Sequence, residues 1–520
     1  MIKYTSSRQI SIEEFKTPFR LGLDKNNRWA LLANRLPWDD LVKTYAKAMR
    51  EDFGRPAISP RIVIGSIIIK HRKRLSDEET IEEIRENPYL QYFLGYEEFS
   101  HKTAFDPSLF VAIRKRLGEE AFNQMSQALI WQSEEVAKRH TKKGKISLSR
   151  KRGDHSGKGD VIDKVRDKKE NSPKSEDKSA EQEKRGSLIL DAVVAPADIK
   201  YPTDLDLLNE SRIKSEELID ALYKPGSCKV KPRSYRQRAK GEYLALVKRK
   251  KKGIKLLRQG IRKQLGYVRR NIRTIHRLLD EYRELPLSYR QLRTLWIIQE
   301  IYRQQREMYD KKSHRISDRL VSISQPHIRP IVRGKAGKEV EFGAQVSASY
   351  IDGYVFVDTI SWDAVHEGLD LVYQVENYRE RFGCYPEAVI ADQKYGTRDN
   401  RRYLKSKRIR YIGKALGRPP KEMTELDKRA RKKLKQLLRS RVKIEGKFGQ
   451  GKRGYDLGLV KAKLPATSAS WIGSVFFMMN LLYWFRENIF VFFTKWLDLS
   501  KYWIEVLNNQ STNMVELIQT

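Results

Sequence analysis

The sequence predicts an α/β protein with an all-α N-terminal domain and a helical insertion after the first strand of its sheet. Short apolar runs typical of strands recur along the second half of the chain, at residues 187–194, 340–346, 354–358, 388–392 and 410–413. Between the first two runs lies a long stretch with helical periodicity. Residues 27–125 show only short helical patterns. The order strand, helices, hairpin, helix, strand, strand, helix follows from these three observations.

The N-terminal helices contain a pair that suits a helix-turn-helix. Ser59-Pro60 is a helix start, and Ser76 with Glu79 forms a capping-box pattern that opens the next helix, which ends at Pro88. Basic residues 70–74 lie between the two helices. Such a pair is typical of DNA readers and also of plain helical bundles, and the sequence leaves both interpretations open.

Composition changes divide the rest of the chain. Residues 141–186 are rich in Lys, Asp, Glu, Ser and Gly and have almost no large apolar side chains, so we expect a charged flexible linker. The predicted organisation is therefore an N-terminal helical domain, the linker, a catalytic core in two pieces, a basic helical insertion and a C-terminal tail. Their bounds are 1–140, 141–186, 187–204 with 338–490, 205–337 and 491–520.

The insertion carries the densest charge. Residues 229–277 hold 19 Lys or Arg and one acid, Glu242, around an apolar seam that runs from Ile254 to Leu279 on one long helix. The charge is either a solvated face or a DNA track, and the lack of balancing acids favours the track. The Asp352-Gly353 pair predicts a hairpin between the second and third strands. Residues 369–382 and 421–448 are expected to be helical.

The formal net charge of +38 points to a polyanionic partner, and nucleic acid fits best. The two cysteines give neither zinc spacing nor a disulfide framework and suit a reducing cytoplasm. The apolar segment 471–485 is interrupted by charge before it reaches the ~20 residues of a membrane span, so a buried helix is expected and a membrane role is not. We find no Walker loop and thus expect no nucleotide cofactor.

Three carboxylates are the candidate chemistry. Asp191 and Asp392 each follow an apolar strand, and Glu445 lies on a helix. Carboxylates that converge could hold two Mg²⁺ ions, of which one activates water or a 3′-hydroxyl and the other stabilises the leaving oxygen. Sequence spacing does not show that the three meet. Asp198, Asp204 and Asp206 compete with Asp191 but are expected in a loop, and His366 is expected to be a surface histidine.

The residues around these acids resemble a known family. Tyr201-Pro202-Thr203-Asp204 after the first strand, Ala391-Asp392-Gln393-Lys394-Tyr395-Gly396, and the spacing Arg441-x₃-Glu445-x₆-Lys452 resemble bacterial insertion-sequence DDE transposases, in particular the groups numbered four and five. The resemblance covers residues 27–125 and about 187–490. Leu438 departs from it, because the family has tyrosine at that position.

The resemblance implies an RNase H-like core, Mg²⁺ or Mn²⁺ as two ions, and a DNA transposase that binds terminal inverted repeats, cleaves strands and transfers them to target DNA. It also implies a homodimer or larger assembly on paired ends, in the cytoplasm with the nucleoid. Carried over, Asp191, Asp392 and Glu445 become the catalytic metal ligands. The candidate DNA phosphate contacts are Arg441, Lys452, Lys443 and Lys447. Arg441, Glu445 and Lys452 fall on one helical stripe.

Two other functions fit the same pattern. One is an RNase H-like nuclease or resolvase that cleaves DNA without strand transfer. The other is an inactive DNA-binding protein derived from a transposase, whose mark would be a lost carboxylate. None of the three is lost here.

Overall fold

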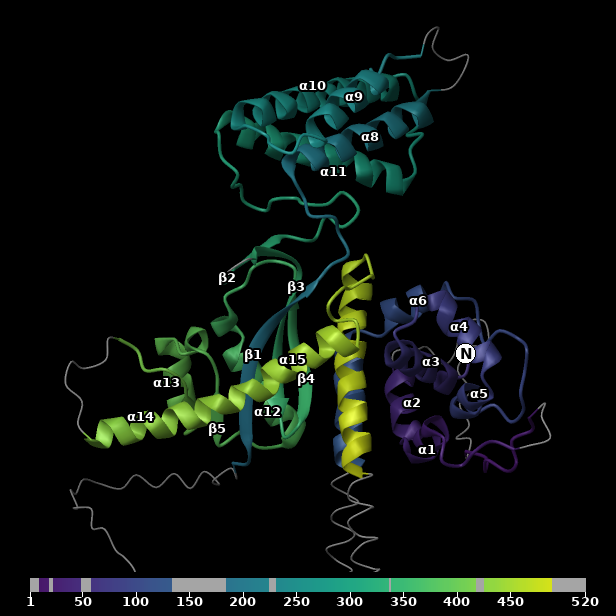
Figure 1. The fold of residues 1–520 in the computed structure, drawn as a ribbon, viewed down its shortest axis with the longest axis vertical. Coiled ribbons are helices and arrows are strands. Elements are labelled where there is room, and N and C mark those ends of the chain that lie inside the picture. Colours follow the sequence, from purple (N-terminus) through teal and green to yellow (C-terminus); the bar gives the residue numbers. More distant parts are fainter. Residues whose placement is uncertain are drawn as a thin grey trace, which may run out of the picture.

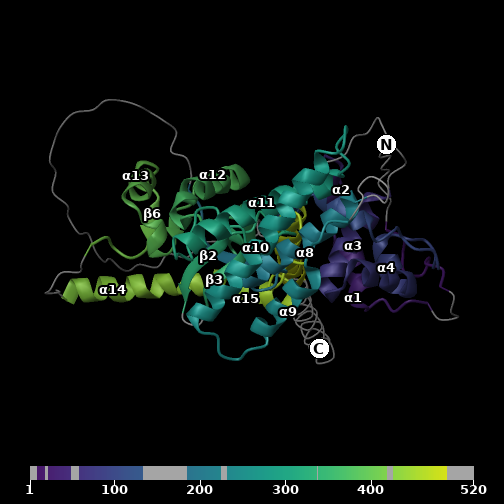
Figure 2. The ribbon, with the colours of Figure 1, turned by 90° about the horizontal axis from the view of Figure 1, so that it is seen from above.

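The computed structural model describes residues 9–17, 22–47, 58–132, 184–223, 231–335, 338–417 and 425–488. These residues form a mixed α/β molecule with a curled sheet, a helical N-terminal region on one side and a helical bundle beyond one end of the sheet (Figure 1). Seen from above, the N-terminal helices and the α13–α14 segment extend to opposite sides (Figure 2). The predicted linker lies outside the described residues except for 184–186, and the predicted tail 491–520 lies wholly outside them.

Where the structure describes it, the N-terminal region is built of helices. Its helices are α1 (Arg28–Arg35), α2 (Trp38–Ala46), α3 (Pro60–Lys73), α4 (Asp77–Glu86), α5 (Pro88–Leu94), α6 (Leu109–Arg116) and a further helix over residues 119–132. The sequence signals mark both helix starts: Ser59 is the N-cap of α3, although its side chain makes no capping hydrogen bond, and Ser76 with Glu79 forms the complete capping box of α4.

The α3–α4 pair exposes only part of the basic segment 70–74, at Arg72 and Arg74. Lys70 and His71, from the basic end of α3, are buried. The ammonium of Lys70 lies 3.0 Å from Asp77. The exposed side chains of α4 are all acidic, at positions 78, 79, 82 and 86. DNA reading by this pair stays a prediction that these positions argue against.

In the part of the chain that the structure describes, the sheet has six strands: β1 (Ser187–Pro196), β2 (Pro330–Lys335), β3 (Lys338–Ile351), β4 (Tyr354–Ser361), β5 (Ala388–Ile390) and β6 (Arg410–Ile412). β1 lies between β3, to which it is antiparallel, and β5, to which it is parallel. β6 continues the parallel side. β3 also pairs antiparallel with β2 and β4. β1 is thus central in the sheet. The predicted hairpin, formed by β3 and β4, lies on its antiparallel side.

The β3–β4 hairpin turns at Asp352-Gly353, as the sequence predicts. Both residues have positive φ, 46° and 96°. This is the backbone that a two-residue hairpin turn with the right-handed twist of the strands requires, and Asp and Gly tolerate it. The turn fixes the register in which Ile351 faces Tyr354.

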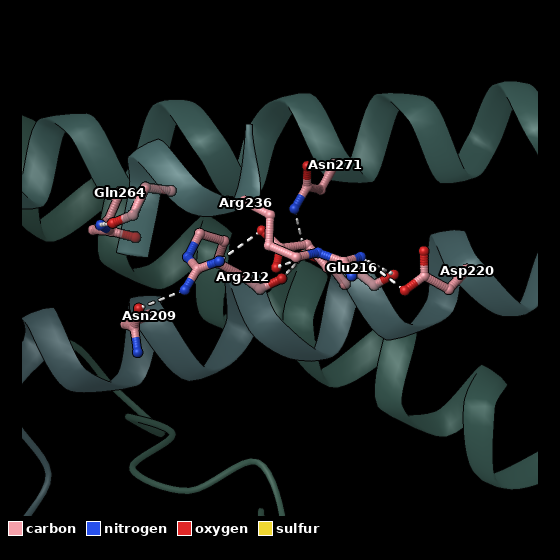
Figure 3. Close-up of polar contacts among 9 residues, drawn as sticks. Asn209, Arg212, Glu216, Asp220, Arg236, Gln264 and Asn271 are labelled. Atoms are coloured by element: carbon pink, nitrogen blue, oxygen red, sulfur yellow. Dashed lines mark hydrogen bonds and ion pairs between the residues drawn. The ribbon is translucent and has the colours of Figure 1, made fainter. Parts of the chain in front are cut away.

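Between β1 and β2, the described residues (184–223 and 231–335) form four helices: α8 (Asp204–Leu222), α9 (Arg236–Val247), α10 (Ile254–Leu279) and α11 (Tyr289–Asp310). They form a bundle with its own apolar core, which includes Leu265 and Val268 of the predicted seam. Ile254, at the start of that seam, is 80% exposed, because it is the first residue of α10. The bundle also buries an ion pair between Arg212 and Glu216, 2.6 Å apart (Figure 3).

One sequence interpretation is wrong here. Asp204 and Asp206 do not lie in a loop but in the first turn of α8, which begins because the Thr203 side chain accepts a hydrogen bond from the Asp206 backbone N–H. Asp204 pairs with Arg319 at 2.7 Å, so it serves the bundle.

The second half of the core contains the remaining helices. They are the short turns η1 (Glu367–Leu369), η2 (Gln393–Tyr395) and η3 (Arg439–Arg441), the helices α12 (Leu371–Phe382), α13 (Arg398–Ser406), α14 (Glu425–Leu438) and α15 (Val442–Gly454), and a C-terminal helix over residues 465–488.

The C-terminal helix, yellow in Figure 1, lies between the sheet and the N-terminal helices. Its apolar segment is buried, as predicted: Phe476 and Phe477 are each 1% exposed. Asn480 bonds both the N–H and the C=O of Val355 on β4, at 2.8 and 2.7 Å. Among the described residues β4 pairs with β3 alone, so this contact satisfies backbone groups on its open edge. Within the described residues, none of the helices combines the length and apolarity needed to cross a membrane.

Candidate active site

Asp191, Asp392 and Glu445 come from three different elements. Asp191 lies in the middle of β1, opposite Ala348 of β3. Asp392 is the N-cap of η2, two residues beyond the end of the neighbouring parallel strand β5. Glu445 lies in the first turn of α15. The pairing of β1 with β5 explains why two acids that are 201 positions apart in the chain lie at neighbouring places on the sheet.

Arg441 joins the three carboxylates. One terminal nitrogen of its guanidinium, Nη2, lies 3.4 Å from Oδ2 of Asp191 and 3.6 Å from Oε1 of Glu445. The other, Nη1, lies 3.4 Å from Oδ1 of Asp392. Because all three acids contact one planar group, their oxygens are separated by ångströms and not by tens of ångströms. Asp191 is the most enclosed of them, with 14% of its side chain exposed, against 40% for Asp392 and 56% for Glu445.

The site concentrates negative charge. Burial raises the pKa of the Asp191 carboxyl, the Arg441 guanidinium lowers it, and Glu367 and Glu445 raise it further. Asp191 also accepts a hydrogen bond from the backbone N–H of Ala192, at 2.9 Å. A carboxylate that resists ionisation and has acidic neighbours favours a bound cation.

The segment that carries Asp392 is held by its neighbours. The Asp392 side chain accepts a hydrogen bond from the Gln393 N–H at 2.7 Å, and its carbonyl accepts one from the Tyr411 hydroxyl at 2.9 Å. Tyr411 lies on β6, the strand that pairs with β5. The position of Asp392 is therefore set by regular sheet structure on two sides.

Two further polar residues at this site were missed by the sequence reasoning. Glu367 has 8% of its side chain exposed and lies 3.1 Å from Lys394. Tyr395 is fully buried, and its hydroxyl has no hydrogen-bond partner among the described residues. Burial, then the charges of Glu367 and Asp191, raise the pKa of Tyr395 well above its usual value. Nothing in the local pattern singles out Glu367; Tyr395 follows Asp392 within the motif and had no role there.

The predicted phosphate contacts take different positions. α15 continues through its glycines to Gly454, so Lys452 lies on the regular helix, seven residues after Glu445 and on the same stripe. Lys443 and Lys447 lie two residues before and after Glu445, which places them on the opposite side of the helix. Lys443 is exposed.

Lys447 lies against another part of the molecule. Its ammonium is 4.6 Å from the centre of the Tyr483 ring, and burial lowers its pKa to about 8. A DNA contact by Lys447 stays a prediction, which this position argues against. Leu438, where the family has tyrosine, is the last residue of α14 and packs against the apolar core.

The donor set suits a hard divalent ion, because it consists of carboxylate oxygens. Among the residues that the structure describes, no three His, Cys, Asp or Glu side chains form a group that could hold an ion as they stand. At this position the Arg441 guanidinium supplies the positive charge that the three acids share.

Comparison with known proteins places two family models on the chain. A Transposase domain (DUF772) matches residues 19–116, and a Transposase DDE domain matches residues 389–482. Two segments of the chain are thus similar to transposase domains. The first covers helices α1–α6; the second covers β5, Asp392, Arg441, Glu445 and much of the C-terminal helix. The resemblance to DDE transposases is thereby confirmed, although Asp191 precedes the matched DDE segment.

One curated protein is similar to part of this chain. It is an uncharacterized protein of Rhizobium meliloti, ORF8 in the nfe locus, and it is 38% identical over 116 residues. The aligned part covers 22% of the present chain and 56% of that protein, so the chain spans about half of its relative's length. No solved structure matches.

Proposed function

We propose that this chain is an insertion-sequence DDE transposase that binds terminal inverted repeats and catalyses metal-dependent DNA strand cleavage and strand transfer. The observation that carries the proposal is the meeting of Asp191, Asp392 and Glu445 at Arg441. Two of these acids lie inside the segment that matches a DDE domain. The third, Asp191, is supplied by the central strand.

The sheet supports an RNase H-like catalytic core, the fold that the resemblance to DDE transposases implies. Its first strand is central, with an antiparallel hairpin on one side and two parallel strands on the other. The acids lie on the central strand, after its parallel neighbour and on a helix that follows the sheet. The four helices α8–α11 between β1 and β2 support the proposed insertion, 205–337, within that core.

In the proposed mechanism the three carboxylates would hold Mg²⁺ or Mn²⁺, as two ions. Such ions supply a lowered pKa for the attacking water or 3′-hydroxyl and neutralise charge on the scissile phosphate. Arg441 lies at the same place and can bind a phosphate oxygen pair through both terminal nitrogens. Lys452, on the same helical stripe, supplies a further point charge. Burial of Asp191 and Glu367 keeps bulk water away from one side of the site.

DNA as the partner is supported by the charge of the whole chain and by the two transposase domains. Assembly as a homodimer or larger on paired DNA ends stays a prediction from the resemblance.

The test is a strand-joining assay on a plasmid that carries the DNA flanking this gene, with Mg²⁺ or Mn²⁺. Asp392→Asn should reduce cleavage and joining by more than about a hundredfold. Loss of a residue that only supports a metal ligand costs up to about a hundredfold, and loss of a ligand itself should cost more. Asp399→Asn is the matched control, because Asp399 is an exposed acid on α13 whose side chain is 85% exposed. Equal activity of both variants would remove Asp392 from the site.

The same assay separates the alternatives. Products that are cleaved but never joined would favour an RNase H-like nuclease. Binding with neither product would favour an inactive, transposase-derived DNA-binding protein.

A further inference from the structure

The polar face of α10 is basic along its whole length. None of its 26 residues is acidic. Five of its cations, which we call the α10 basic stripe, recur at spacings of seven, seven, four and four residues and are all exposed: Lys255, Arg262, Arg269, Arg273 and Arg277. At these spacings they lie on one side of the helix, opposite the buried seam that includes Leu265 and Val268.

The other cations of α10 have partners within the bundle. Lys263 lies 3.1 Å from Glu242 of α9. Arg258 lies over the ring of Tyr309 on α11, and Arg270 over the ring of Tyr235 next to α9. By contrast, no ion pair or ring contact that the structure gives for its described residues involves a member of the stripe.

The inward face of α10 also makes hydrogen bonds within the bundle. Figure 3 shows Asn271 and Gln264 turned toward the interior of the bundle. Asn271 donates to the Ser215 hydroxyl at 2.9 Å, and Gln264 to the carbonyl of Ala239 at 3.2 Å. The bundle thus uses the inner and flanking residues of α10 for its own stability and leaves the stripe for another purpose.

The stripe has a cost in the isolated protein. Arg269, Arg273 and Arg277 are separated by four residues each, and like charges at that spacing destabilise a helix by about 0.2–0.5 kcal/mol per pair. A polyanion that lies along the helix relieves this repulsion. Large apolar side chains anchor protein partners. On α10 such a side chain is exposed only at Ile254, the first residue, and the rest of the exposed face has none.

The length of the stripe matches duplex DNA. From Lys255 to Arg277 the helix rises about 33 Å at 1.5 Å per residue. One turn of B-DNA is about 34–36 Å long. Phosphates repeat along a duplex without interruption, as the cations do along this face.

We propose that the α10 basic stripe is a binding site for the phosphate backbone of duplex DNA, separate from the carboxylate site. It holds the DNA through charge alone and over about one helical turn. The bundle that carries the stripe lies beyond one end of the sheet to which Asp191 belongs (Figure 1). This inference rests on the proposed function only in taking DNA as the partner.

The test compares two double variants that remove equal charge. Arg269→Gln/Arg273→Gln changes the stripe. Arg303→Gln/Arg306→Gln, on α11, is the matched control, because these exposed arginines already pair with Glu300, Glu307 and Asp310. Binding of a labelled nonspecific duplex about three turns long is measured by fluorescence anisotropy over a range of salt concentrations, with no divalent metal present.

The stripe variant should lower the slope of log affinity against log salt by about 1.8, since each phosphate contact contributes about 0.9. It should also weaken binding at low salt by at least tenfold, while the control changes affinity less than twofold. Its thermal midpoint should equal or exceed that of the wild type, because the substitution removes a repulsive pair.

Equal slopes in the two variants would overturn the proposal. Because the assay contains no metal and reads only binding, this outcome leaves strand cleavage untouched. Conversely, a chain that shows the expected slopes but neither cuts nor joins DNA would contradict the proposed function and support the stripe.

Discussion

At the scale of single residues, Arg441 decides the electrostatics of the candidate site. It is the N-cap of α15 and places one guanidinium against acids from β1, η2 and α15. Three carboxylates so close together repel one another, and the guanidinium offsets this repulsion. A divalent cation would offset it more strongly, because it carries twice the charge.

Arg441→Gln should therefore change how the protein responds to metal. Without divalent ions the variant should lose about 1 kcal/mol of stability, a modest figure because Asp392 and Glu445 are each more than a third exposed. Adding Mg²⁺ should raise the thermal midpoint of the variant more than that of the wild type, because the three acids of the variant lack the Arg441 guanidinium. Arg439→Gln, an exposed neighbour on η3, is the control. Identical metal-dependent shifts in both variants would contradict this account of Arg441.

At the scale of elements, α15 carries Glu445 on a helix that contains several glycines. Glycine costs a helix interior about 1 kcal/mol relative to alanine. A Cβ at Gly446 would meet nothing within 4 Å, whereas one at Gly451 would lie 3.0 Å from Leu457 and 3.3 Å from Met479. The two glycines therefore have different reasons to be present.

Gly446→Ala should raise the free energy of unfolding by up to about 1 kcal/mol, because it adds helix propensity at an open, exposed position. Gly451→Ala should gain less or lose stability, because its methyl must displace Leu457 and Met479. Urea unfolding of both variants checks the pair. Equal gains would mean that the packing at Gly451 is looser than the structure indicates.

Local rules predicted the elements where one signal dominated. The capping box at Ser76, the turn at Asp352-Gly353 and the buried apolar segment of the C-terminal helix all follow from neighbouring residues. The loop expected at Asp204 was wrong, because proline-rich surroundings hid the cap that Thr203 provides. The sequence left open whether the basic end of α3 faces DNA or packs within a bundle, and in the structure Lys70 is buried beside Asp77 of α4.

At the scale of the whole molecule, the apolar core continues from the N-terminal helices through the C-terminal helix to the sheet. His71 of α3 lies in this junction. Its Nε2 is 2.7 Å from the hydroxyl of Ser474, and its ring meets Trp471 edge-on. Burial, with the charges of Lys70 and Arg114, lowers the pKa of His71 to about 3, and Asp77 opposes this shift.

The junction should weaken in mild acid. A histidine whose pKa is about 3 when folded and about 6.5 when unfolded takes up a proton on unfolding anywhere between these values. Its stabilising contribution is thus complete above pH 6.5 and is lost as the pH falls toward 3. At pH 5 the loss should be about 2 kcal/mol relative to pH 7.

Urea unfolding at pH 7 and pH 5 measures this effect, and His71→Gln should show a smaller difference between the two. An equally large difference in that variant would assign the acid sensitivity to other groups.

The site shows why sequence alone stops short. The apolar runs before the two aspartates and the motif spacing were enough to propose Asp191, Asp392 and Glu445. The expected strand end at Asp191 was wrong, because β1 continues past it to Pro196. The meeting of the three acids depends on the pairing of β1 with β5, across about two hundred residues that include the bundle. The same long-range packing buries Glu367 and Tyr395 beside Asp191, and no local pattern carries that information. Arg441 was expected at a phosphate, and its contact with all three acids appears only in three dimensions.

The most direct measurement is an anomalous difference map from crystals of the full chain soaked in Mn²⁺. We predict a peak bounded by the carboxylates of Asp191, Asp392 and Glu445, with the Arg441 guanidinium moved aside. A map with manganese bound elsewhere, or with none beside these three acids at saturating Mn²⁺, would contradict a metal-dependent active site at this position.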